Sequence, residues 1–184
     1  IDRVYADQKE ANLPRGTFDE VVGLILREIE GVRNELVVDW RAENLDEKLG
    51  RITRGAALAL KSRVLLYAAS PQFNPSGEKS KWAAAAAAAF EVINMGIYSL
   101  HPDYGGLFVA ETSTTSPETI WAVRMGATNE FERKNYPIGT QGGGTGICPS
   151  QNLVEAYEST GEDTGDAYAG LDPRFYATVL RNGD

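Results

Sequence analysis

Residues 52–67, ITRGAALALKSRVLLY, and residues 82–96, WAAAAAAAFEVINMG, decide the fold that we expect for this chain. Both stretches combine alanine, the strongest helix former, with larger apolar residues at helical spacing. Proline cannot continue a helix, so Pro71 ends the first stretch. The pattern predicts helices at about 53–70 and 80–95 that pack as a close antiparallel pair. We expect four side chains to be buried between these two helices: Leu60, Val64, Ala86 and Ile93.

A third helix is predicted upstream, at about 17–37. Thr17 and Glu20 have the spacing of a capping box, and apolar residues follow at helical intervals. The small residues of the later pair, and the spacing from Ala86 to Phe90, are typical of tetratricopeptide repeats. A generic helical hairpin is the alternative, because one pair does not make a repeat array.

The pattern changes in the second part of the chain. Residues 118–125 alternate between apolar and polar side chains, which predicts a short strand. Residues 126–149 form a long loop rich in glycine, and loops of this length are usually functional or mobile. We therefore expect a mainly α fold with two parts: tetratricopeptide-like helix pairs over 1–109, and a loop-rich part with short strands over 110–184.

Composition limits the classes of partner. The chain has 184 residues, enough for one domain, and a net charge of −8 from 26 acidic and 18 basic residues. This balance would repel a nucleic-acid backbone. The single cysteine excludes a disulfide framework and a multi-cysteine zinc site. The longest apolar run, residues 82–90, is shorter than the roughly 20 residues of a membrane span. Because the chain begins at Ile1 without a signal sequence, we interpret it as an internal segment of a longer protein.

Catalytic and cofactor motifs are weak. The glycine run 142–146 lacks the lysine and hydroxyl residue that end a phosphate loop, which favours a mobile loop or a close backbone approach. His101 and Cys148 are the only residues of their types. A cysteine–histidine nucleophile is conceivable, but His101 lies in a turn. The acidic residues of 158–172 lack the spacing of a calcium loop. We expect no metal ion, no cofactor and no catalytic residue.

Several aromatic residues lie outside the helical apolar stripes: Trp40, Phe73, Phe131, Tyr136 and Tyr168. Aromatic rings offer large apolar faces that suit sugar rings or peptides, and amides bond to sugar hydroxyls, which both donate and accept. The candidate ligand-binding residues all lie in the loop 126–146, and they are Asn129, Phe131, Tyr136 and Gln141. Because like charges repel, the net negative charge favours a neutral ligand. The alternative is that Phe131 and Tyr136 only anchor their loop to the core.

These stretches together resemble the SusD/RagB family of outer-membrane nutrient-binding lipoproteins. The resemblance begins with the helix at 52–67 and continues with Tyr98-Ser99-Leu100, Pro102-Asp103-Tyr104 and Glu118-Thr119-Ile120-Trp121. It ends with the segments 149–158 and 172–178. The order and spacing of these motifs agree with the family over roughly residues 20–182.

The resemblance implies a largely helical protein that binds oligosaccharides at the outer membrane and catalyses nothing. It implies a SusC-like TonB-dependent transporter as the partner, and membrane association only through an N-terminal lipid anchor that this segment lacks. The sugar-contacting residues of the family vary too much to be transferred by motif. A helical-repeat adaptor for a peptide or protein, and a glycoside hydrolase that uses loop carboxylates, are the two alternatives.

Overall fold

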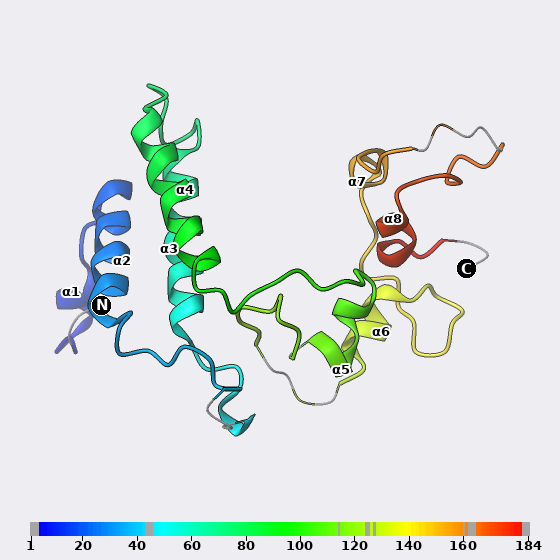
Figure 1. Cartoon of the computed structure of the whole chain (residues 1–184), viewed down its shortest axis with the longest axis horizontal. Helices are drawn as coiled ribbons and strands as arrows, with labels where there is room; N and C mark the ends of the chain where they lie inside the picture. The colour runs from blue at the N-terminus through cyan, green and yellow to red at the C-terminus, as the bar shows by residue number, and fades with distance from the viewer. Residues whose placement is uncertain are drawn as a thin grey trace. The chain divides into compact units, whose positions relative to one another are not determined.

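Three helices dominate the first of two units in the computed structural model of the chain. They are α2 (Phe18–Val32), α3 (Arg54–Ala69) and α4 (Lys79–Ile93). Figure 1 shows α3 and α4 as antiparallel neighbours, and α2 also packs against α3. This unit spans Ile1–Tyr98, and the second spans Ser99–Asp184.

The remaining helices are short. They are α1 (Gln8–Ala11), α5 (Ala110–Ser113), α6 (Glu130–Asn135), α7 (Gln151–Glu155) and α8 (Pro173–Thr178), with the 3-10 turns η1 (Asp46–Lys48) and η2 (Gly106–Phe108). The structure describes residues 4–42, 46–113, 115–123, 126, 128–159, 161 and 165–181. Over these residues the protein is mainly helical, as the sequence predicted.

The starts of α2 and α3 follow the sequence closely. The amide of Glu20 donates to Thr17 Oγ1 over 3.2 Å, and the amide of Thr17 donates to Glu20 Oε2 over 2.8 Å. This reciprocal pair is the predicted capping box. Thr53 caps α3 by accepting from the amide of Ala56. However, α2 ends at Val32, five residues before the predicted end near residue 37.

The α3–α4 pair forms as predicted, but its predicted contact residues are wrong. Leu60 is 49% exposed and Ile93 is 67% exposed. Ala86 is also exposed, and Val64 is half-buried. The side chains that are buried on these two helices are mostly small: Ala57, Leu58, Ala68 and Ala69 on α3, and Ala85, Ala88 and Val92 on α4. The helix axes therefore come together over alanine, and the larger residues stay outside.

Four charged side chains explain this choice of face. Lys61 Nζ on α3 lies 2.6 Å from Glu30 Oε1 on α2 and 2.7 Å from Glu91 Oε1 on α4. Arg33, which follows α2, contacts Glu91 Oε2 at 2.7 Å and Glu30 Oε2 at 3.1 Å. On α4, Glu91 follows the buried Ala88 by three residues, and residues three apart are neighbours on one helix face. The four-charge cluster of Glu30, Arg33, Lys61 and Glu91 thus favours the rotation that turns alanine inwards.

A close approach also explains the glycine near the start of α3. The ring of Tyr98 lies directly over Gly55, where a Cβ atom would stand 1.8 Å from the phenol oxygen. Burial raises the pKa of Tyr98, while a hydrogen bond with Thr53 acts in the opposite direction. Any side chain at residue 55 would therefore displace the ring of Tyr98.

The turn between α3 and α4 is held by a buried amide. Asn74 is 3% exposed. Its Nδ2 donates to the carbonyl of Glu78 over 3.1 Å, and its Oδ1 accepts from the amide of Glu78 over 2.9 Å. The neighbouring Phe73 stacks on Phe18 at the start of α2, with ring centroids 3.8 Å apart. Phe73 is therefore a structural anchor of the turn.

The predicted strand at 118–125 is wrong for the part that the structure describes. Residues 118–123 have no strand conformation, while Arg124 and Met125 lie outside the described residues. A strand needs a partner strand, whereas the amide of Thr119 bonds within a turn to the carbonyl of Ser116, and the neighbouring Pro117 carbonyl accepts a single bond from the amide of Ser99. Within the described residues, β pairing is limited to two isolated bridges, Ile138 with Thr140 and Ser159 with Leu171.

The first prediction compares two leucines on α3. Leu58 is 2% exposed, whereas Leu60 is 49% exposed. Leu58→Ala should lower the free energy of unfolding by about 2–5 kcal/mol, because it leaves a cavity at the helix interface. Leu60→Ala should cost less than about 1 kcal/mol. Urea denaturation followed by circular dichroism measures both, and equal losses would contradict this interface.

The second prediction concerns acid stability. The hydrogen bond from Lys61 is the main cause that lowers the pKa of both Glu30 and Glu91 below 4.5. A lowered pKa means that the stabilisation is present above pH 4.5 and is lost as the pH falls through the folded-state pKa.

Lys61→Met should therefore reduce the loss of unfolding free energy on acidification by roughly 1 kcal/mol. The effect is this small because the ion pairs are partly exposed and screened. Urea denaturation of both proteins over a pH series would measure the difference. Parallel curves would show that the cluster adds no pH-dependent stability.

Candidate functional site

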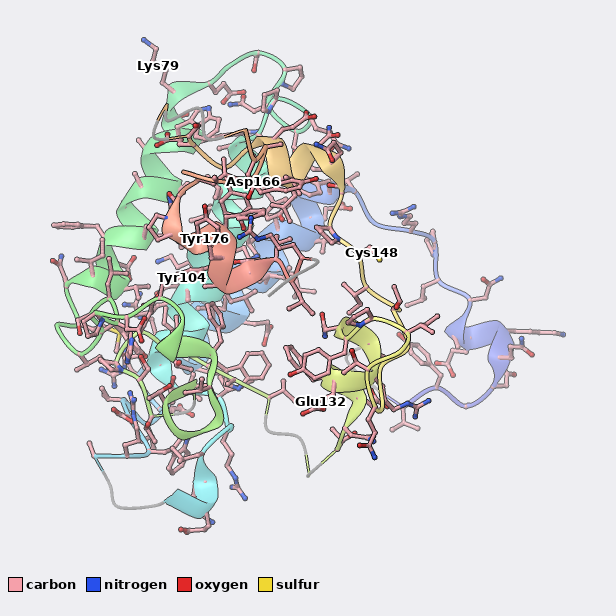
Figure 2. The ribbon with its side chains drawn as sticks, turned by 90° about the vertical axis from the view of Figure 1, so that its right-hand side faces the viewer. Lys79, Tyr104, Glu132, Cys148, Asp166 and Tyr176 are labelled. Atoms are coloured by element: carbon pink, nitrogen blue, oxygen red, sulfur yellow. The ribbon has the colours of Figure 1, made fainter. Side chains whose placement is uncertain are left out.

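The second unit is organised around one buried aromatic ring. Phe175 on α8 is 1% exposed. Tyr157 and Tyr176 meet its ring edge to face, with centroids at 5.4 and 5.3 Å, and Tyr168 lies parallel to it at 6.0 Å. The predicted loop aromatic Tyr168 thus serves the core. Figure 2 labels Tyr176 on α8.

Local sequence explains how α8 begins. Asp172 caps the helix by accepting from the amide of Arg174 over 2.8 Å, and Pro173 takes a helix position that needs no amide hydrogen. The Arg174 side chain also donates to Asp172 over 2.9 Å. This hydrogen bond lowers the pKa of Asp172 to about 2. Asp172 therefore stays ionised at neutral pH and has no proton to give as a general acid.

An open groove lies beside α8, with a volume of about 630 Å³. One wall comes from α6 and its end, with Phe131, Asn135 and Tyr136. The opposite walls come from residues 147–150 with Leu153, and from residues 176–180. A second hollow of about 520 Å³ shares Tyr136 and the segment 147–149 and continues past them to Thr140, Thr145 and Arg181. Both volumes lie in the usual range of ligand sites.

The glycine-rich loop contributes Thr140 and Thr145 to the continuation of the groove. The amides of Thr145 and Gly146 donate to the carbonyls of Tyr136 and Lys134 over 3.0 and 2.8 Å. A Cβ atom on Gly143 would lie 2.3 Å from the Pro137 carbonyl oxygen. The close backbone approach favoured by the sequence is therefore present, and these amides are used to hold the loop on the end of α6.

The groove brings together two of the four predicted ligand-binding residues. Phe131 is 70% exposed and Tyr136 is 39% exposed, and both line the groove. Asn129 precedes α6 and Gln141 lies in the glycine-rich loop, both exposed but not among the lining residues. Sequence reasoning missed Tyr176. The sequence contains little sign that Tyr176 lines a groove, because Tyr176 directly follows the buried Phe175 in a short helix.

Other chemistry named by the sequence does not assemble into a site. The His101 ring lies within its own turn, with Nδ1 at 2.6 Å from the carbonyl oxygen of Asp103. Cys148 is exposed and lines the groove instead (Figure 2). Glu162 and Asp163 of the acidic stretch lie outside the described residues. Across the residues that the structure describes, no group of three metal-ligating side chains is found, and no helix has the length and apolarity of a membrane span.

These features define the second unit as a loop-rich, helical segment with an aromatic-lined open groove. Residues 117–184 match the model of the SusD family, so this part of the chain is similar to SusD/RagB proteins. The match covers both walls of the groove and the aromatic cluster around Phe175. The earlier motifs of the resemblance, including the helix at 52–67, precede the matched range. Neither the curated proteins nor the solved structures contain a match to the chain.

Proposed function

We propose that this chain is part of a non-catalytic, outer-membrane lipoprotein that binds a neutral oligosaccharide and delivers it to a SusC-like TonB-dependent transporter. The family match over residues 117–184 is the observation that carries the proposal, since SusD family proteins are non-catalytic binding proteins. The ligand site that we assign is the groove between α6, the segment 147–150 and α8.

The chemistry of the groove supports a sugar ligand. Among the described residues that line it and its continuation, the polar side chains are mainly hydroxyls, with the amide of Asn135, the thiol of Cys148 and the guanidinium of Arg181, and none is a carboxylate. In a chain with 26 acidic residues this is a marked local difference. Aromatic rings beside hydroxyl and amide groups suit a ligand with an apolar ring face and polar edges.

The same groove offers little to a hydrolase. Glycoside hydrolysis generally needs one carboxyl group that gives a proton and a second that attacks or activates water. Asp172 lies outside the groove, in a separate hollow with Glu158 and Arg174. Its pKa of about 2 keeps it ionised. The geometry of the described residues therefore favours binding over turnover.

The third prediction tests the groove through Tyr136. Its backbone is held at both the amide and the carbonyl, so removal of the ring should leave the loop in place. Tyr136→Ala should weaken oligosaccharide binding by about 1–3 kcal/mol and leave the melting temperature almost unchanged, as expected for an exposed binding anchor. Tyr136→Phe is the matched control and should keep most of the affinity.

Calorimetry against a panel of soluble neutral oligosaccharides of glucose, mannose, galactose and xylose measures the affinity, and a thermal melt measures stability. If Tyr136→Ala has a lower melting temperature while its folded fraction binds with normal affinity, the ring only anchors the loop. Tyr136 would then not belong to the ligand site.

The fourth prediction concerns the partner and the location. The full-length parent protein should co-purify with a TonB-dependent transporter from detergent-solubilised outer membranes. An outer-membrane protein unrelated to transport serves as the control for non-specific recovery. Recovery of the parent protein only in the soluble cytoplasmic fraction would reject both the partner and the location.

A further inference from the structure

The groove contains one aromatic ring that is held more firmly than the two predicted from the sequence. The hydroxyl of Tyr176 donates to the carbonyl of Tyr168 over 2.9 Å and accepts from the amide of Leu171 over 3.3 Å. Its ring packs edge to face on Phe175, and the guanidinium of Arg181 lies 5.4 Å from its centroid. The ring is therefore fixed at its hydroxyl, by Phe175 and by a cation.

Despite these contacts, Tyr176 remains available to a ligand. It is 44% exposed, and it lines the groove together with Phe131 and Tyr136. By contrast, Phe131 is 70% exposed, and no ring packs on it among the described aromatic contacts. A ligand that stacks on a mobile ring must first lose the rotamer freedom of that ring, whereas a fixed ring has already lost it.

We propose that Tyr176 is the principal stacking residue of the groove, and that it selects a neutral pyranose unit with a continuous C–H face. This inference rests on the proposed function. It adds which residue sets the affinity of the groove and which kind of sugar ring that residue selects. A pyranose with mainly equatorial hydroxyls exposes axial C–H groups, which form a flat apolar face against an aromatic ring. Phe131 and Tyr136 then contact the neighbouring sugar units of the oligosaccharide.

The chain offers a matched control for the structural role of Tyr176. Tyr157 packs on the same Phe175 ring with almost the same geometry, at 5.4 Å and 74° against 5.3 Å and 81°. However, Tyr157 lines the separate hollow beside Asp172 and does not line the groove. Tyr157→Ala and Tyr176→Ala therefore remove equivalent packing from Phe175, and only the second removes a groove ring.

The experiment measures the binding of the strongest oligosaccharide of the neutral panel to the folded 184-residue chain, by calorimetry, with a melt for each variant. Tyr176→Ala should weaken binding at least about tenfold, whereas Tyr157→Ala should change it by less than about twofold although it also lowers the melting temperature. Tyr176→Phe keeps the ring but removes both hydroxyl contacts, so it should lose about two- to fivefold.

The outcomes separate the two proposals. If the wild-type chain binds a panel sugar and Tyr176→Ala binds it equally well, Tyr176 is only a structural residue and this inference is overturned while the proposed function stands. Equal losses in Tyr157→Ala and Tyr176→Ala would also overturn it, because general loosening around Phe175 would then explain both. If the wild-type chain binds no sugar of the panel, the proposed function fails and the inference falls with it.

Discussion

The arrangement of the first unit depends on the ion pairs that Lys61 makes with Glu30 and Glu91. Alanine covers several sides of α4, so apolar burial alone leaves the rotation of that helix poorly determined. A charged side chain between helices is different, because it is costly to leave without a partner. By satisfying Lys61 from both neighbouring helices, the chain selects one rotation of α4 and places α2 against the same pair.

The second unit is stabilised differently, because its helices are short and most of its residues lie in loops. A short helix such as α8 is marginal by itself and needs tertiary contacts. Here the buried Phe175 collects three tyrosine rings, and the glycine-rich loop is tied to the end of α6 by backbone hydrogen bonds. Loops held in this way can carry a binding surface without long helices or a sheet behind them.

Local signals in the sequence predicted the helices well, and long-range contacts explain what was missed. Thr17, Thr53 and Pro71 marked where helices begin or end, since caps and prolines act within one turn. The buried face of α4 was wrong because the large residues Phe90 and Ile93 outweighed alanine in the apolar pattern. For the candidate groove, the sequence singled out the lining residues Phe131 and Tyr136 because they lie in a polar loop, whereas Tyr176 gains its position from contacts that no short-range pattern encodes.

The position of Cys148 has a practical consequence. It is the chain's only thiol, it is exposed, and it belongs to the wall that the groove shares with its continuation. A thiol-reactive fluorophore would therefore attach at a single place, within reach of whatever enters the groove. The native chain can therefore be labelled selectively at the groove, and no cysteine has to be introduced or removed.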